Sequence, residues 1–144
     1  MQMKRASMIV LSKEKIPIQK EQDVILFRNR IKEVATKIGM SLVNQTKLMT
    51  AASELVRNML RYGGGGITHL EVVSRNSIPG VKLSFIDEGP GIQDITLAMK
   101  DGYSTGKSLG LGLPGAKRLV NEFDIKSEPG KGTTVTIIRW KNGL

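Results

Sequence analysis

The first half of the chain contains two stretches in which apolar residues recur every three or four positions. In residues 21–38 this spacing places the apolar side chains on one face of a helix that ends at Gly39. The same spacing resumes after Ser41, a suitable N-cap, and continues to about Tyr62. Four consecutive glycines, 63–66, then end the pattern, because glycine loses much conformational entropy in a helix. We therefore predict two long amphipathic helices.

Shorter apolar or alternating runs predict strands elsewhere. Pro17 separates the first run from the first helix, and turn residues at 76–80 and 129–132 join the later runs into two hairpins. The predicted strands are residues 6–11, 67–75, 81–87, 124–128 and 133–140.

The segment between the two hairpins contains many of the 16 glycines. We predict a short helix over 94–100, a polar loop over 101–109, and a third main helix that has Pro114 near its start and reaches Phe123. The complete pattern predicts one domain, 1–144. Its fold class is α/β (α+β), a two-layer sandwich with a mixed, mainly antiparallel sheet covered by helices on one face.

Composition limits the function classes. The 22 basic and 13 acidic residues give a net charge of +9, which favours acidic partners. Nucleic acid is disfavoured, because the basic residues are spread along the chain and aromatic residues make up only 4%. The absence of cysteine excludes disulfides and thiolate metal sites. No apolar run approaches the ~20 residues of a membrane span, so we expect a cytoplasmic protein with no membrane contact.

Candidate chemistry begins where the predicted strand 81–87 delivers a carboxylate into a glycine turn, Asp87-Glu88-Gly89-Pro90-Gly91. Such a turn allows backbone to approach a flat, polar ligand closely. Asp-x-Gly-x-Gly also occurs in ordinary turns, so this motif requires further support.

A second candidate lies on the predicted helix 41–62. Glu54 and Asn58 are four residues apart and share one helix face, which Arg61 continues. A carboxylate can polarise an attacking hydroxyl, and an amide oxygen can ligate Mg²⁺. The alternative is a solvated face on which Glu54 pairs with Arg57, Asn58 or Arg61.

Two familiar glycine motifs fail in the segment 101–115. Residues 102–108 nearly match a P-loop, but Asp101 occupies the position of the first glycine and no apolar strand precedes it. Residues 110–115 match Gly-x-Gly-x-x-Gly, but they follow polar residues and no acidic residue lies ~20 positions further on.

The order of the remaining motifs is more specific than any one of them. Glu-x-x-x-Asn on a helix, Asp-x-Gly-x-Gly after a strand, a polar loop, Gly-x-Gly opening a helix, and Gly132-Thr133 opening a strand resemble the GHKL family of ATP-binding proteins, which includes DNA gyrase and histidine kinases. The resemblance covers residues from about 50 to 138 and implies the Bergerat fold and the cofactors ATP and Mg²⁺.

The family resemblance also implies roles for individual residues. Asp87 would bind the adenine amino group, and Thr133 would assist through water. Asn58 would hold Mg²⁺, and Glu54 would be the catalytic base. The remaining implied nucleotide-binding residues approach the phosphates, shape the pocket floor or belong to the lid loop: Arg61, Gly89, Gly91, Thr105, Lys107, Gly110 and Gly112.

Within this superfamily, residues 52–58, 87–92 and 102–119 are similar to the anti-sigma-factor serine/threonine kinases, and especially to the RsbT-type switch-kinase branch of stressosomes. That resemblance implies phosphorylation of an antagonist protein of the STAS class. It also implies partner switching, in which the kinase activates a PP2C-type phosphatase. The alternative is an anti-sigma factor, or a nucleotide-gated binding module that transfers no phosphate. A homodimer stays open.

Overall fold

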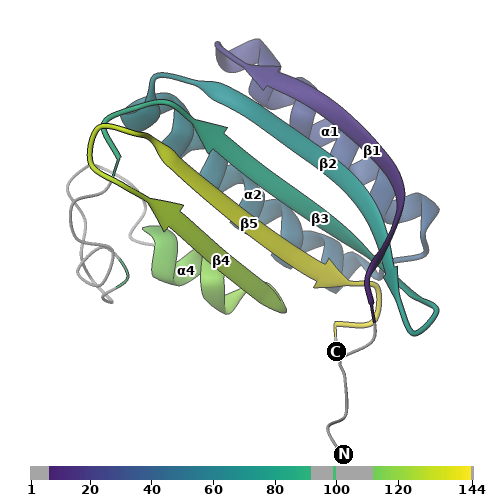
Figure 1. Ribbon diagram of the computed structural model, residues 1–144. Coiled ribbons are helices and arrows are strands. Elements are labelled where there is room, and N and C mark those ends of the chain that lie inside the picture. Colours follow the sequence, from purple (N-terminus) through teal and green to yellow (C-terminus); the bar gives the residue numbers. More distant parts are fainter. Residues whose placement is uncertain (1–6, 92–98, 100–111, 144) are drawn as a thin grey trace, which may run out of the picture.

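The computed structural model describes residues 7–91, 99 and 112–143, which form two layers. One layer is a five-stranded sheet with the strand order β1-β2-β3-β5-β4, and the helices all cover the same face of it (Figure 1). The elements, in chain order, are β1 (Ile9–Ile18), α1 (Glu21–Lys37), α2 (Leu42–Gly63), β2 (Gly66–Arg75), β3 (Ile78–Asp87), α4 (Gly112–Arg118), β4 (Glu122–Ser127) and β5 (Thr133–Trp140). The predicted two-layer α/β sandwich is therefore confirmed.

The sheet is antiparallel in every described strand pair, whereas we expected a mixed, mainly antiparallel sheet. Antiparallel pairing brings the end of one strand to the beginning of its neighbour. Asp87, the last residue of β3, is consequently paired with Thr133, the first residue of β5. Gly66 begins β2 at the same end of the sheet, opposite Ile18.

The first strand is longer than predicted and begins later, at Ile9 rather than at residue 6. It continues through Pro17, which we expected to break it. Proline is tolerated here because β1 is an edge strand, paired among the described strands with β2 alone, so one row of its N–H groups needs no partner. The polar residues at 12–15 are tolerated because their side chains are exposed or only partly buried.

The two long helices are confirmed. The Ser41 hydroxyl accepts a hydrogen bond from the Asn44 N–H at 3.2 Å, and Gly64 closes α2 in the left-handed conformation at φ +74°. Among the described residues, no helix is long and apolar enough to cross a membrane.

The third helix is shorter than predicted. α4 begins two residues before Pro114 and ends at Arg118, and Phe123 lies in β4 instead of in the helix. Phe123 packs against the core from β4. The core contact that we expected it to make from a helix is therefore made from a strand. The turn of the first hairpin is also tighter than predicted, with Asn76 and Ser77 both at positive φ.

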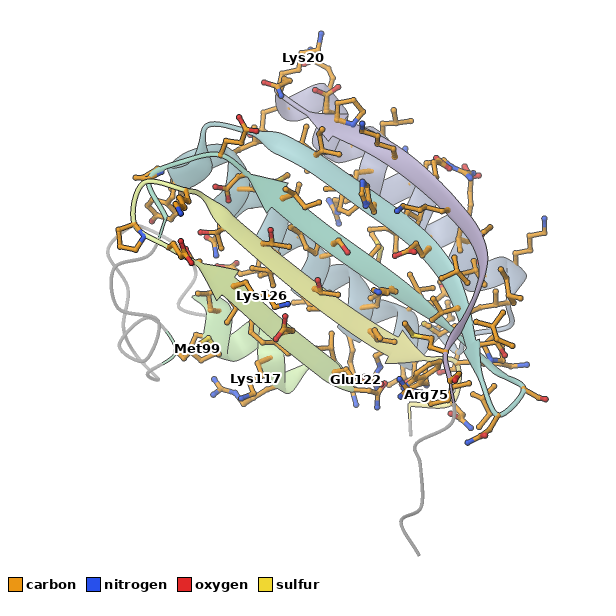
Figure 2. The ribbon with its side chains drawn as sticks, viewed as in Figure 1. Lys20, Arg75, Met99, Lys117, Glu122 and Lys126 are labelled. Atoms are coloured by element: carbon orange, nitrogen blue, oxygen red, sulfur yellow. The ribbon has the colours of Figure 1, made fainter. Side chains whose placement is uncertain are left out.

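The core lies between the helices and the sheet. Phe27 of α1 is fully buried and meets Phe85 of β3 edge to face, with ring centroids 5.7 Å apart. The opposite face of the sheet carries a smaller cluster near one end of β4 and β5 (Figure 2). There the Glu122 carboxylate accepts from Arg75 Nη1 at 2.7 Å and from Trp140 Nε1 at 3.2 Å. This cluster stands at the opposite end of the sheet from Asp87.

His69 of β2 makes folding stability depend on pH. Partial burial and the nearby Lys13 and Lys15 hold the pKa of His69 below its ordinary value, although Glu71 acts in the opposite direction. The unfolded chain therefore binds a proton at a higher pH than the folded chain does. Stability that is present above the ordinary histidine pKa of about 6.5 is lost as the pH falls below it.

Urea unfolding at about pH 7.5 and about pH 5.5 should show this loss of stability. The substitution His69→Gln should reduce the difference between the two pH values. An unchanged pH dependence in the variant would contradict the assignment to His69.

Candidate functional site

The Asp87 carboxylate lies at the end of the central strand β3, at the point where this strand becomes the predicted glycine turn. Asp87 is partly buried, and its Oδ1 accepts a hydrogen bond from the Gly89 N–H at 2.9 Å. This bond holds the carboxylate at the beginning of the turn. The lone pairs that this bond leaves over can accept from a ligand.

Backbone from three separate segments crowds around Asp87. A Cβ added to Gly63, the last residue of α2, would stand 2.6 Å from Asp87 Cγ. One added to Gly89 would meet Gly63 Cα at 2.6 Å, and one added to Gly132 would meet the Asp87 carbonyl oxygen at 2.1 Å. A Cβ added to Gly91 would stand 2.2 Å from the Glu128 carbonyl oxygen. These contacts show that side chains are excluded around the carboxylate by packing.

Gly63 and Gly64 provide a matched test of this packing. Gly63→Ala should displace the Asp87 carboxylate and lower ATP affinity on the order of tenfold, because the methyl group has no space there. Gly64→Ala has open space but a left-handed backbone, so it should cost about 1 kcal/mol of stability and leave ATP affinity unchanged. Calorimetric ATP titration and urea unfolding of both variants separate the two effects. Equal ATP affinities in the two variants would contradict this interpretation.

Thr133 stands beside Asp87, as the sequence-based interpretation requires. The two residues are register partners on β5 and β3, and the Thr133 hydroxyl is 2.8 Å from the Ser127 hydroxyl. The Thr133 hydroxyl thus adds a second polar group at this end of the sheet.

Glu54 is buried on α2, with 9% of its surface exposed, and is held by α4. Its Oε1 accepts a hydrogen bond from the Gly112 backbone N–H at 3.1 Å. Among the ion pairs of the described residues, none joins Glu54 to Arg57 or Arg61. The solvated-face alternative therefore does not describe this carboxylate.

Asn58 follows Glu54 by one helical turn, and its half-buried side chain makes no hydrogen bond to another described residue. Arg61 is exposed in the last turn of α2. Gly63, which packs against Asp87, follows Glu54 by nine residues, or about 13 Å along the helix axis. The second half of α2 thus connects the pair Glu54 and Asn58 with the residues around Asp87.

The described residues contain no cluster of three or more histidines, cysteines, aspartates or glutamates that could hold a metal ion. A divalent ion here would need oxygen ligands from a bound phosphate as well, which is usual for Mg²⁺. The Asn58 amide oxygen, one turn from a carboxylate, is of the right type for such an ion.

Three predicted site residues, Thr105, Lys107 and Gly110, lie outside the described residues, as do most of the predicted helix 94–100 and the loop 101–109. Sequence reasoning did not place two glycines against Asp87: Gly63, and Gly132, which entered only as part of the Gly132-Thr133 motif that opens a strand. The signal for the first was present, since one left-handed glycine suffices to end a helix and the chain has four in a row. From the sequence alone, these glycines predict only a helix end.

The chain combines this fold with a carboxylate in a glycine turn and a nearby helix that carries glutamate and asparagine. Together these features define the class of protein to which it belongs. Residues 43–143 match the family described as "Histidine kinase-, DNA gyrase B-, and HSP90-like ATPase". The chain belongs to this ATPase family, the GHKL superfamily predicted from its motifs.

Individual relatives place the chain more closely. It is 42% identical over 125 residues to the serine/threonine-protein kinase RsbT of Bacillus subtilis (strain 168), covering 87% of this chain and 94% of that protein. It is 29% identical over 130 residues to an anti-sigma F factor of Thermoanaerobacter sp. (strain X514), covering 85% and 89%. The predicted resemblance to the RsbT-type branch is thus confirmed.

A solved structure supports the fold. The chain superimposes on the crystal structure of the RsbU and RsbW domains of Rv1364c from Mycobacterium tuberculosis with a TM-score of 0.62. The match covers 89% of this chain and 32% of that one, at 21% identity.

Proposed function

We propose that this protein is an ATP-dependent serine/threonine protein kinase of a sigma-factor pathway. The observation that carries the proposal is the position of Glu54, which is buried, held by Gly112 at 3.1 Å and one turn from Asn58. ATP binding alone does not need this carboxylate, whereas transfer to a hydroxyl does. Similarity to a serine/threonine kinase over most of both chains supports the same function.

In the proposed site, Asp87 accepts a hydrogen bond from the adenine amino group, and Thr133 contacts the base through water. Gly89 and Gly91 form the floor of the pocket. The phosphates extend along α2 toward Arg61 and the Gly112 N–H, with Thr105, Lys107 and Gly110 contributing from the lid. Asn58 holds Mg²⁺, which offsets the phosphate charge when it is bound.

The transfer step then involves Glu54 directly. Glu54 takes the proton of the acceptor serine or threonine hydroxyl while that oxygen forms a bond to the γ-phosphorus. The bond between the γ-phosphorus and the bridging oxygen breaks, and ADP leaves with the electron pair of that bond. The Gly112 N–H holds the Glu54 carboxylate in position for this proton transfer, and Arg61 offsets charge on the phosphoryl oxygens.

The partners we propose are a STAS-domain antagonist as the phosphate acceptor and a PP2C-type phosphatase as the second partner, in the cytoplasm. The test is a capture experiment with the immobilised kinase, the purified antagonist and the purified phosphatase. Before ATP is added the antagonist should be bound. After Mg-ATP is added it should be released as a phosphoprotein of higher mass, and the phosphatase should take its place.

The second candidate function is a nucleotide-gated anti-sigma factor, favoured by the similarity to anti-sigma F factors. In the same experiment it would bind a sigma factor in a nucleotide-dependent way and leave the antagonist unmodified. Capture without any change in the mass of the antagonist would therefore favour this alternative over the kinase.

A further inference from the structure

The outward face of the α2–α4 layer carries cations that no described carboxylate neutralises. Lys47 and Arg57 of α2 and Lys117 of α4 are exposed, and the ion pairs of the described part of the chain include none of them. Glu54, the sole acidic residue of α2, is buried, and α4 has no acidic residue. On α1, by contrast, Arg30 is paired with both Glu14 and Glu33. We call Lys47, Arg57 and Lys117 the basic helical face.

The basic helical face surrounds the candidate base. Lys47 precedes Glu54 by seven residues, so it stands on the same side of α2 about 10 Å along the axis. Arg57 follows Glu54 by three residues and lies on that side as well. No aromatic residue occurs in α2 between Lys47 and Arg57.

α4 brings Lys117 alongside the same part of α2. The Gly112 N–H at the start of α4 donates to Glu54. Just after α4, the Leu119 carbonyl accepts from Arg139 at 2.9 Å, and the same guanidinium donates to Asn44 of α2 at 2.6 Å. α4 therefore runs beside the first half of α2, and its exposed Lys117 lies at the rim of the molecule, next to β4 (Figure 2).

Small, neutral residues lie between the cations of α2. Thr50 and Ser53 separate Lys47 from Arg57, and the Thr50 hydroxyl donates to the Thr46 carbonyl at 2.8 Å within the helix. Because the Thr50 hydroxyl already has this partner, a protein surface that covers it does not leave that hydroxyl unpaired.

We propose that the basic helical face docks an acidic surface of the protein substrate beside Glu54. This inference rests on the proposed function, because an acceptor hydroxyl that reaches Glu54 requires its protein to lie across α2 and α4. Unneutralised cations attract an acidic surface and orient it during encounter. An acidic protein fits better than a single-stranded nucleic acid, because α2 offers no aromatic side chain among these cations on which bases would stack.

The test is the double charge reversal Lys47→Glu/Lys117→Glu, with Lys15→Glu/Lys32→Glu as the matched control. Lys15 and Lys32 are also exposed but lie on β1 and α1. The test variant should raise the KM for the STAS-domain antagonist by about tenfold or more and leave ATP affinity within about twofold. Lys47→Arg/Lys117→Arg should behave as the wild type does. Equal KM values in the test and control variants would overturn the inference.

A binding measurement separates this inference from the proposed kinase activity. Calorimetry of the antagonist with the wild type and both double variants requires no turnover. Binding that is weakened only by Lys47→Glu/Lys117→Glu would support the docking surface. If the wild type binds in this way but transfers no phosphate, the kinase function is rejected and the docking surface is kept. Absence of wild-type binding would overturn the docking surface. So would a variant-sensitive affinity for a DNA duplex or phosphatidylserine vesicles at physiological salt in place of the antagonist.

Discussion

Asp87→Asn should lower ATP affinity on the order of 100-fold without unfolding the protein. The carboxylate accepts a hydrogen bond from the Gly89 N–H at 2.9 Å and, in the proposed complex, a second from the adenine amino group. An amide keeps a single oxygen acceptor and adds an N–H₂ group, which cannot accept from either donor. Loss of a hydrogen bond to a charged group in a confined site costs about 1.5–3 kcal/mol. Calorimetric titration with Mg-ATP measures the change directly.

The control for this prediction is Asp124→Asn. Asp124 is an exposed carboxylate on β4, away from the glycine turn, so its variant should bind ATP as the wild type does. Urea unfolding of both variants checks that the fold is kept. If Asp87→Asn binds ATP as tightly as Asp124→Asn does, the pocket has been assigned to the wrong residues.

Glu54→Gln should slow phosphotransfer by about 10²- to 10⁴-fold while ATP still binds, because it removes the general base. The substitution is nearly isosteric, and the glutamine oxygen can still accept from the Gly112 N–H, which Glu54 contacts at 3.1 Å. The geometry of α2 against α4 should therefore survive. The rate is measured as phosphoserine or phosphothreonine formed on the STAS-domain antagonist at saturating ATP.

Glu21→Gln, at the exposed start of α1, is the matched control and should transfer phosphate at the wild-type rate. A wild-type rate in Glu54→Gln would remove Glu54 from the role of base. A large loss of ATP affinity in the same variant would instead make Glu54 a structural support for α4.

The elements that the sequence predicted well are those with strong periodicity and a clear end. The helix after Ser41 shows both, since its cap and its glycine end are local properties of the chain. The ordered motifs likewise predicted that Asp87 and Thr133 act together, and the β3–β5 register places them side by side.

The sequence did not reveal contacts that depend on how separate segments pack. The strand through Pro17 is possible because β1 is at the edge of the sheet, and strand order is a tertiary property. The approach of Gly63 to Asp87 is a meeting of a helix end with a strand end. The bond between Glu54 and the Gly112 N–H joins residues 58 positions apart, so the burial of Glu54 could not be predicted from its own helix.

The most direct test of the kinase assignment is a single-turnover experiment with γ-labelled ATP, in which the wild-type kinase is in excess over the STAS-domain antagonist. We predict that the label appears on a serine or threonine of the antagonist at the rate at which ATP disappears. Release of the label as inorganic phosphate, or binding of ATP with no label transferred, would contradict the assignment.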